Sequence, residues 1–172
     1  DFAGVPVLQF ETTFMNKWEV LIKRFMDILA SGILIILLSP LLLFVAILIK
    51  RVSPGGSVFF RQKRCGLNGR IFWLMKFRTM VPNAEQLQQE LQKYNEATGP
   101  VFKMTNDPRI IPYGRFLRKF SLDELPQLFN VFVGHMSLVG PRPPLPSEVD
   151  EYDDWQRRKL SVRPGITCIW QV

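Results

Sequence analysis

The sequence predicts an α+β protein, in which a re-entrant membrane helix-hairpin precedes a small, mostly helical domain with a short β-hairpin. Three observations lead to this prediction. An uncharged apolar run covers residues 28–49. Two strand-like runs flank the turn sequence Gly66-Leu67-Asn68-Gly69. The rest of the chain consists of helix-favouring segments separated by proline-rich loops, and its 172 residues suit one ordinary domain.

The first element is expected to be irregular. Residues 1–19 alternate in apolar character and do not begin with Met, so we interpret them as the remnant of a preceding domain or linker. Residues 20–52 form the predicted membrane-associated segment. Residues 53–172 form the predicted cytoplasmic domain.

The apolar run at 28–49 is the predicted membrane helix, and at about 33 Å it is long enough to span a bilayer. Pro40 lies at its centre and removes a backbone donor, while the hydroxyl of Ser39 can satisfy a freed carbonyl. Basic residues favour the cytoplasmic side, and they flank both ends of the run: Lys23, Arg24, Lys50 and Arg51. A helix that breaks at Ser39-Pro40 and returns to the same face satisfies both ends. A straight span is the alternative.

After the membrane helix, short strands are expected at 57–62 and 70–77, joined as a hairpin. Asn83 can cap a surface helix over 83–97. Further helices are predicted at about 111–119 and 121–133. The segment 136–146 (MSLVGPRPPLP) is too proline-rich for regular structure, and an acidic helix is expected at 148–160.

Charge and cysteine content limit the function classes. The net charge is +7, and the segment 50–81 carries basic residues without an acidic one. Such a field suits phosphate groups, whether of anionic lipid, a nucleotide diphosphate or nucleic acid. The chain has 2 cysteines and 1 histidine, without metal-ligand spacing, so neither a zinc site nor a disulfide framework is expected.

The adjacent carboxylates Asp123 and Glu124 are the strongest candidates for chemistry. Ser121 and Glu124 fit a capping box, whereas Pro126 fits the first helical turn better if Asp123 is the cap. Either arrangement puts both carboxylates at the positive end of a helix, which favours the ionised form of a nucleophile or metal ligand.

Nearby arginines can compensate this negative charge. Arg115 and Arg118 precede the carboxylates by one or two turns, and Arg142 is available from a proline-rich loop. Guanidinium groups bind phosphate oxygens in a bidentate manner. A nucleotide diphosphate substrate, a divalent ion on Glu124 and an attacking Asp123 form a coherent set.

Several motifs together resemble a known family. They are KRxxD at 23–27, KFRTM at 76–80, GRFLRK at 114–119, SLDELPQLFNV at 121–131 and MSLVGPRP at 136–143. In this order they resemble the bacterial sugar transferase family, the monotopic polyprenyl-phosphate phosphoglycosyl transferases, over residues 20–172. The N-terminal stretch resembles the end of the preceding domain in larger members, the undecaprenyl-phosphate glucose- and galactose-phosphotransferases.

The resemblance implies a two-step reaction on the cytoplasmic face of the bacterial inner membrane. Asp123 would attack the β-phosphate of a UDP-sugar, expel UMP and hold the phosphosugar covalently. Undecaprenyl phosphate would then accept the sugar-1-phosphate, in the first membrane step of exopolysaccharide, capsule or O-antigen synthesis. Glu124 would hold Mg²⁺. Glucose and galactose are the sugars that the resemblance favours.

The resemblance also implies roles for other residues. Arg118 and Arg142 match phosphate-binding arginines of the motifs, Lys76, Arg78 and Arg115 are further candidates, and Ser39 with Pro40 would hold the helix break. The implied partners are the two substrates, membrane lipid and a second copy in a homodimer, without nucleic acid.

This chain departs from the family pattern at three places. His135 stands where Asp is usual, Cys168 stands where Gly is usual, and the chain ends at Val172, before the family's Gly-Arg and closing helices. We therefore expect a C-terminally incomplete catalytic domain and no catalytic role for His135.

Two other functions remain open from the sequence. A non-catalytic basic module that binds anionic lipid or nucleic acid explains the charge and the apolar run. An ordinary glycosyltransferase would release UDP instead of UMP.

Overall fold

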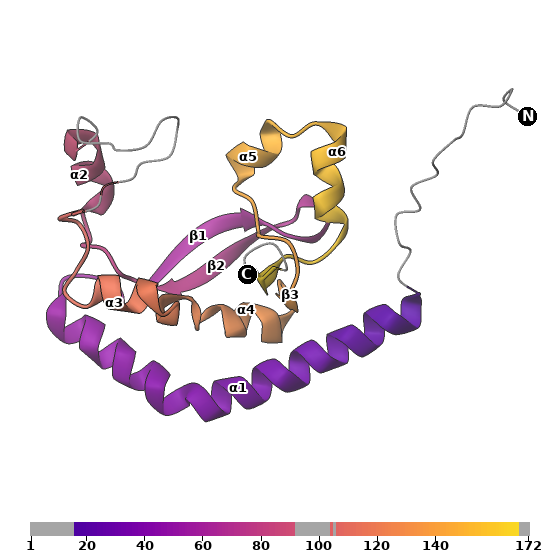
Figure 1. Cartoon of the computed structure of the whole chain (residues 1–172), viewed down its shortest axis with the longest axis horizontal. Coiled ribbons are helices and arrows are strands. Elements are labelled where there is room, and N and C mark those ends of the chain that lie inside the picture. Colours follow the sequence, from indigo (N-terminus) through magenta and orange to yellow (C-terminus); the bar gives the residue numbers. More distant parts are fainter. Residues whose placement is uncertain (1–15, 92–103, 105, 169–172) are drawn as a thin grey trace, which may run out of the picture.

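A long bent helix underlies the rest of the protein (Figure 1). The computed structural model describes residues 16–91, 104 and 106–168. Helix α1 (Lys17–Val52) runs along one side, and α3 (Gly114–Lys119) and α4 (Gln127–Val133) lie between it and the β-hairpin. The expected remnant at 1–19 falls almost wholly outside the described residues.

Helix α1 bends and stays continuous through Ser39-Pro40, the place where the sequence predicts that the helix breaks. The helix is continuous from Lys17 to Val52 with Pro40 inside it. Pro40 cannot donate to the carbonyl of Ile36, and the hydroxyl of Ser39 donates to that carbonyl instead, at 2.7 Å. Figure 1 shows the ribbon changing direction partway along, with both ends rising toward the rest of the molecule.

The outer surface of α1 is apolar. Ile36 is 76% exposed, and many other large apolar side chains of the helix are exposed as well. Among the described residues, α1 is the one helix whose length and composition suit a membrane crossing.

The two halves of α1 are attached differently. In the first half, Arg24 donates to the carbonyls of Val131 and Phe132 at the end of α4, at 2.7 and 2.8 Å. Asp27 accepts from the backbone N–H of Leu138 at 3.1 Å. In the second half, the buried side chains of Val45 and Ile49 belong to a core cluster that also contains Phe77, Ile111 and Leu117.

The predicted hairpin is confirmed, with shifted strand ends. Strands β1 (Phe59–Cys65) and β2 (Ile71–Phe77) are antiparallel and are joined by the 3-10 turn η1 (Leu67–Gly69). Asn68 adopts a φ of 55°, which asparagine tolerates well. The side chains of Phe60, Gln62 and Arg64 share one face of β1, because side chains alternate along a strand.

Asn130 attaches α4 to the free edge of β2. Its side-chain oxygen accepts from the backbone N–H of Met75 at 3.0 Å, and its amide donates to the carbonyl of Trp73 at 2.8 Å. The side chain thus takes the place of a neighbouring strand. Nearby, Val131 packs in a second core cluster: Phe72, Leu74 and Met136.

The helical segments differ from the predicted ones where the structure describes them. Helix α2 covers Ala84–Leu91, and the predicted continuation to 97 lies outside the described residues. Helix α3 begins at Gly114, not at 111, because Tyr113 is left-handed with a φ of 67°. The single helix predicted over 121–133 is wrong: a 3-10 turn η3 (Leu122–Glu124) precedes a separate α4.

The prediction of irregular structure at 136–146 is wrong for its first part. Strand β3 (Ser137–Val139) precedes the first proline of the segment and pairs in parallel with β4 (Gly165–Thr167). Gly140 and Gly165 allow the close approach, since a Cβ on Gly165 would lie 2.1 Å from the nitrogen of Gly140.

The acidic helix predicted at 148–160 is divided into three pieces. They are α5 (Pro146–Asp150), α6 (Asp154–Arg157) and the 3-10 helix η4 (Arg158–Ser161). Asp153 separates α5 from α6, because its carboxylate caps α6 by accepting from the backbone N–H of Gln156 at 2.7 Å, and η4 follows α6 directly.

Candidate active site

Asp123 and Glu124 lie in a short turn with an unusual entry, which we call the carboxylate turn (residues 121–124). Ser121 is left-handed, with a φ of 54°, and reverses the chain after α3. Neither predicted cap forms: the Ser121 side chain makes no capping hydrogen bond, and Pro126 occupies the N-cap position of α4. The two carboxylates therefore precede α4 instead of belonging to its first turn.

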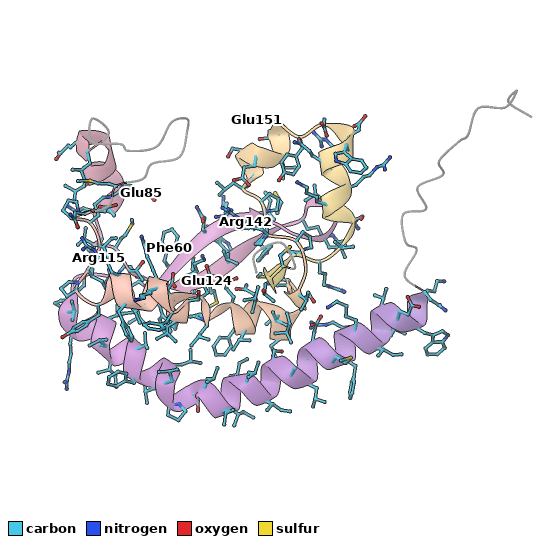
Figure 2. The ribbon with its side chains drawn as sticks, viewed as in Figure 1. Phe60, Glu85, Arg115, Glu124, Arg142 and Glu151 are labelled. Atoms are coloured by element: carbon cyan, nitrogen blue, oxygen red, sulfur yellow. The ribbon has the colours of Figure 1, made fainter. Side chains whose placement is uncertain are left out.

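The carboxylate turn forms one wall of a pocket of 620 Å³. The β-hairpin supplies Phe60, Gln62 and Lys76, and α3 supplies Arg118. The segment from Phe77 to Pro82, the start of α2 and Arg109 complete the lining. In Figure 2, Glu124 lies near the centre of the molecule, with Glu85 on α2. The pocket thus joins chain segments that are far apart in sequence.

Asp123 is nearly enclosed, at 9% exposed. Burial raises the pKa of its carboxyl group, and Glu124 adds to this, whereas Lys76 and Arg118 oppose it. No other described residue donates a hydrogen bond to the carboxylate. Burial thus acts against the ionised form of Asp123, opposite in direction to the effect expected from the positive end of a helix.

Glu124 has a different environment from its neighbour. One of its oxygens accepts from the Lys76 ammonium at 2.5 Å, and the two side chains are 35% and 29% exposed. Because the other Glu124 oxygen has no such partner among the described residues, it is available to a ligand. Adjacent carboxylates in unequal environments can take separate chemical roles.

The predicted arginines differ in their placement. Arg118 lines the pocket, and its Nε donates to the Thr79 hydroxyl at 2.8 Å. Arg78 also lines the pocket but is buried, with Nη2 donating to the Ser53 carbonyl at 2.7 Å. Arg115 is exposed on α3 and does not line the pocket (Figure 2).

A second pocket, of 290 Å³, adjoins the first and shares Lys76 and Glu124 with it. Its wall contains the predicted Arg142, which is exposed on the proline loop (residues 141–144), and Gln127 of α4. It also contains Arg64, which sequence reasoning did not select. The alternation of β1 could have indicated Arg64, because it puts this residue on the face of Phe60 and Gln62.

The residues fit a metal ion that arrives with its ligand. The described residues contain no group of three or more His, Cys, Asp or Glu side chains that could hold a metal. Magnesium is often bound by one or two carboxylates together with substrate phosphates and water. Glu124, with Asp123 beside it, meets that requirement.

The residues at which the chain departs from the family pattern lie away from the carboxylate turn. The His135 ring is exposed and 5.6 Å from the ring of Phe72. Cys168 follows β4 and is half-buried. Neither lines the two pockets.

Comparison with known proteins agrees with the motifs. The chain is 43% identical over 171 residues to the galactosyl transferase CpsE of Streptococcus agalactiae, covering 99% of this chain and 38% of the relative. It is 44% identical over 154 residues to the exopolysaccharide production protein ExoY of Rhizobium meliloti, covering 87% and 68%. It is 38% identical over 194 residues to an undecaprenyl-phosphate galactose phosphotransferase of Salmonella typhimurium, covering 99% and 40%.

The extent of these matches identifies the family. The chain spans well under half the length of the CpsE and Salmonella relatives. The family model described as bacterial sugar transferase matches residues 18–172, which include all of α1 but its first residue, both pockets and the carboxylate turn. The chain therefore belongs to the bacterial sugar transferase family.

Proposed function

We propose that this chain transfers a sugar-1-phosphate from a UDP-sugar to undecaprenyl phosphate, through a phosphosugar held covalently on Asp123. One observation carries the proposal: Asp123 is a buried carboxylate that faces a 620 Å³ pocket between Lys76 and Arg118. Relatives named as undecaprenyl-phosphate galactose and glucose-1-phosphate transferases support the substrate class. Galactose and glucose are accordingly the first sugars to test.

In the first step, an oxygen of Asp123 forms a bond to the β-phosphorus of the UDP-sugar. The bond between that phosphorus and the bridging oxygen breaks, and UMP leaves with the electron pair. Burial removes water from the attacking carboxylate, and a carboxylate of raised pKa is a stronger nucleophile once ionised. In the second step, an oxygen of the lipid phosphate attacks the same phosphorus, and Asp123 is released as a carboxylate.

The surrounding cations reduce the charge repulsion of this attack. Arg118 presents its guanidinium to the pocket while its Nε is held by Thr79. Lys76 lines both pockets. When Glu124 binds a metal cation instead of Lys76, the Lys76 ammonium can pair with a phosphate oxygen. Glu124 would hold Mg²⁺, which supplies charge neutralisation for the diphosphate when it is bound.

We also propose that α1 is a re-entrant helix in the inner membrane and that the pockets face the cytoplasm. The bend and the rise of both helix ends toward the domain support this topology (Figure 1). Basic residues at both ends of the helix favour one and the same side. A homodimer remains a prediction.

Covalent labelling tests the reaction. Incubation with UDP-sugar labelled in the sugar should give a labelled protein and one UMP per label, and both should disappear in Asp123→Asn. Asp27→Asn is the matched control, because it alters another buried aspartate that lines neither pocket at the carboxylate turn. Release of UDP would indicate an ordinary glycosyltransferase. Absence of any label in a folded, longer form of the protein would favour a non-catalytic basic module.

Accessibility labelling tests the topology. Single cysteines at positions 21 and 55, in a chain whose Cys65 and Cys168 are replaced by alanine, should both react from the cytoplasmic side only. Reaction from opposite sides would make α1 a straight span.

A further inference from the structure

The smaller pocket contains positive charge for which the proposed first step has no assigned use. Arg64 on β1 and Arg142 on the proline loop both line the 290 Å³ pocket. No ion pair joins either arginine to a carboxylate within the described part of the chain. Two unpaired guanidinium groups around one hollow favour an anion in it.

Arg64 is held rigidly in this position. It is 8% exposed, its Nη1 donates to the Pro143 carbonyl at 3.1 Å, and its Nη2 donates to the Gln62 side chain at 2.8 Å. Its buried Nε has no hydrogen-bond partner among the described residues. Burial and the neighbouring Arg142 lower the pKa of Arg64, so they disfavour its charged form. A bound anion would favour the charged form again.

Arg64 also connects the pocket to the proline loop. Its contact with Pro143 holds the residue that follows Arg142, so the buried arginine fixes the loop that carries the exposed one. A purely structural role would end there. A role in binding substrate is indicated by the shared walls, because Lys76 and Glu124 line both pockets, so the two arginines lie close to the carboxylate turn.

We propose that Arg64 and Arg142 bind the phosphate that stands opposite Asp123, first the α-phosphate of the nucleotide and then the phosphate of the lipid acceptor. The inference rests on the proposed two-step function. In phosphoryl transfer, the attacking and leaving oxygens lie roughly in line with the phosphorus. Asp123 attacks from one side, so UMP leaves on the other side. The lipid phosphate must displace Asp123 from the side that UMP has left.

This arrangement makes two phosphates compete for one place. UMP should therefore inhibit the second half-reaction competitively with the lipid phosphate. Inorganic phosphate should lower the rates of both half-reactions. Each half-reaction breaks one phosphorus–oxygen bond and forms one, so the pocket needs no further reactant. The smaller pocket thus binds each leaving or entering phosphate in turn.

The test compares Arg64→Gln with Arg61→Gln, an exposed arginine on the same strand that lines neither pocket. Formation of the covalent label, and its transfer to lipid phosphate after removal of UMP, should each slow by about 10- to 100-fold in Arg64→Gln. Arg64→Lys should recover part of both rates, and Arg61→Gln should leave both unchanged. A slower first half-reaction with a normal second one would overturn the proposal, as would inhibition by UMP that lipid phosphate does not relieve.

Two further measurements separate this inference from its alternatives. Arg142→Gln removes an exposed side chain, so it keeps the test valid if Arg64→Gln folds poorly. Binding of UMP and of inorganic phosphate to Asp123→Asn, measured by calorimetry, requires no covalent step and should be lost when Arg64→Gln is added. If wild type forms no label, the proposed function fails, whereas loss of that binding still supports the anion pocket. Unchanged binding of both probes would refute the pocket directly.

Discussion

Two of the buried aspartates, Asp27 and Asp123, lie in regions that treat their side chains in opposite ways. Asp27 lies where α1 meets β3, at 5% exposed, and accepts from the backbone N–H of Leu138 and from the Lys23 ammonium. Asp123 lies in the carboxylate turn, at 9% exposed, and receives no hydrogen bond from another described residue. The buried Asp27 carboxylate therefore stabilises the fold through its hydrogen bonds, whereas the buried Asp123 carboxylate destabilises the fold because it lacks such bonds.

The backbone of the two regions differs in the same sense. We call the contact of α1 with β3 and the end of α4 the junction; it contains Arg24, Asp27 and Leu138. At the junction a φ of 103° is adopted by Gly134, and glycine adopts this conformation without strain because it has no Cβ. In the carboxylate turn a φ of 54° is taken by Ser121. The junction uses residues suited to their conformation and fully paired, whereas the carboxylate turn keeps charge and strain. This difference is what a reactive site set on a stable support requires.

The largest effect is expected from removing the Asp27 carboxylate. Asp27→Ala leaves the N–H of Leu138 without its acceptor and removes one partner of the partly exposed Lys23 ammonium, which should lower the free energy of unfolding by about 3 kcal/mol. The melting temperature in detergent should then fall by about 6–12 °C. Tryptophan fluorescence during heating gives the measurement.

Two variants calibrate that result. Asp27→Asn keeps an oxygen for Leu138 and should lose only part of the stability. Lys17→Ala alters an exposed charge on the same helix and should have little effect. Equal melting temperatures for Asp27→Ala and Lys17→Ala would contradict a structural role of the junction.

The opposite sign is expected at the carboxylate turn. Asp123→Asn removes a buried charge that has no hydrogen-bond donor, and it should raise the free energy of unfolding by about 1 kcal/mol at neutral pH. The melting temperature should rise by about 2–4 °C, while covalent labelling is lost. A fall in melting temperature like that of Asp27→Asn would show that Asp123 is a structural residue.

The pH dependence of this gain follows from the raised pKa of Asp123. In wild type, the stability supplied by protonated Asp123 is complete below the ordinary carboxyl pKa of about 3.9 and is lost as the pH rises through the higher folded pKa. Wild type and Asp123→Asn should therefore melt alike near that lower limit, and their difference should grow as the pH rises toward neutrality. A difference that stays constant with pH would exclude Asp123 as the cause.

Sequence reasoning reached the features that depend on local pattern. The apolar run of α1, the role of Ser39 beside Pro40 and the hairpin around Asn68 follow from composition and neighbouring residues. The motifs identified the family and selected Asp123, Glu124, Arg118 and Arg142 as a group, and these residues line the two adjoining pockets.

The missed features all depend on distant segments. The pairing of β3 with β4 joins Ser137 to Gly165, which no local pattern announces. The raised pKa of Asp123 depends on burial against other parts of the fold. The alternation of β1 could have put Arg64 on the face of Gln62, but the pocket that it shares with Arg142 and Gln127 is known only from the fold.

The smallest expected effect tests the strain in the carboxylate turn. A left-handed residue other than glycine costs about 1 kcal/mol, and the greater freedom of glycine in the unfolded chain offsets part of this. Ser121→Gly should therefore raise the free energy of unfolding by about 0.5 kcal/mol and the melting temperature by about 1–2 °C. Ser121→Ala keeps the strain and should give no gain.

Gly134→Ser makes the reverse change at the junction, where Arg24 lies 3.0 Å from the new Cβ, and should lower the melting temperature. If Ser121→Gly and Gly134→Ser shift it in the same direction, backbone conformation does not distinguish the two regions.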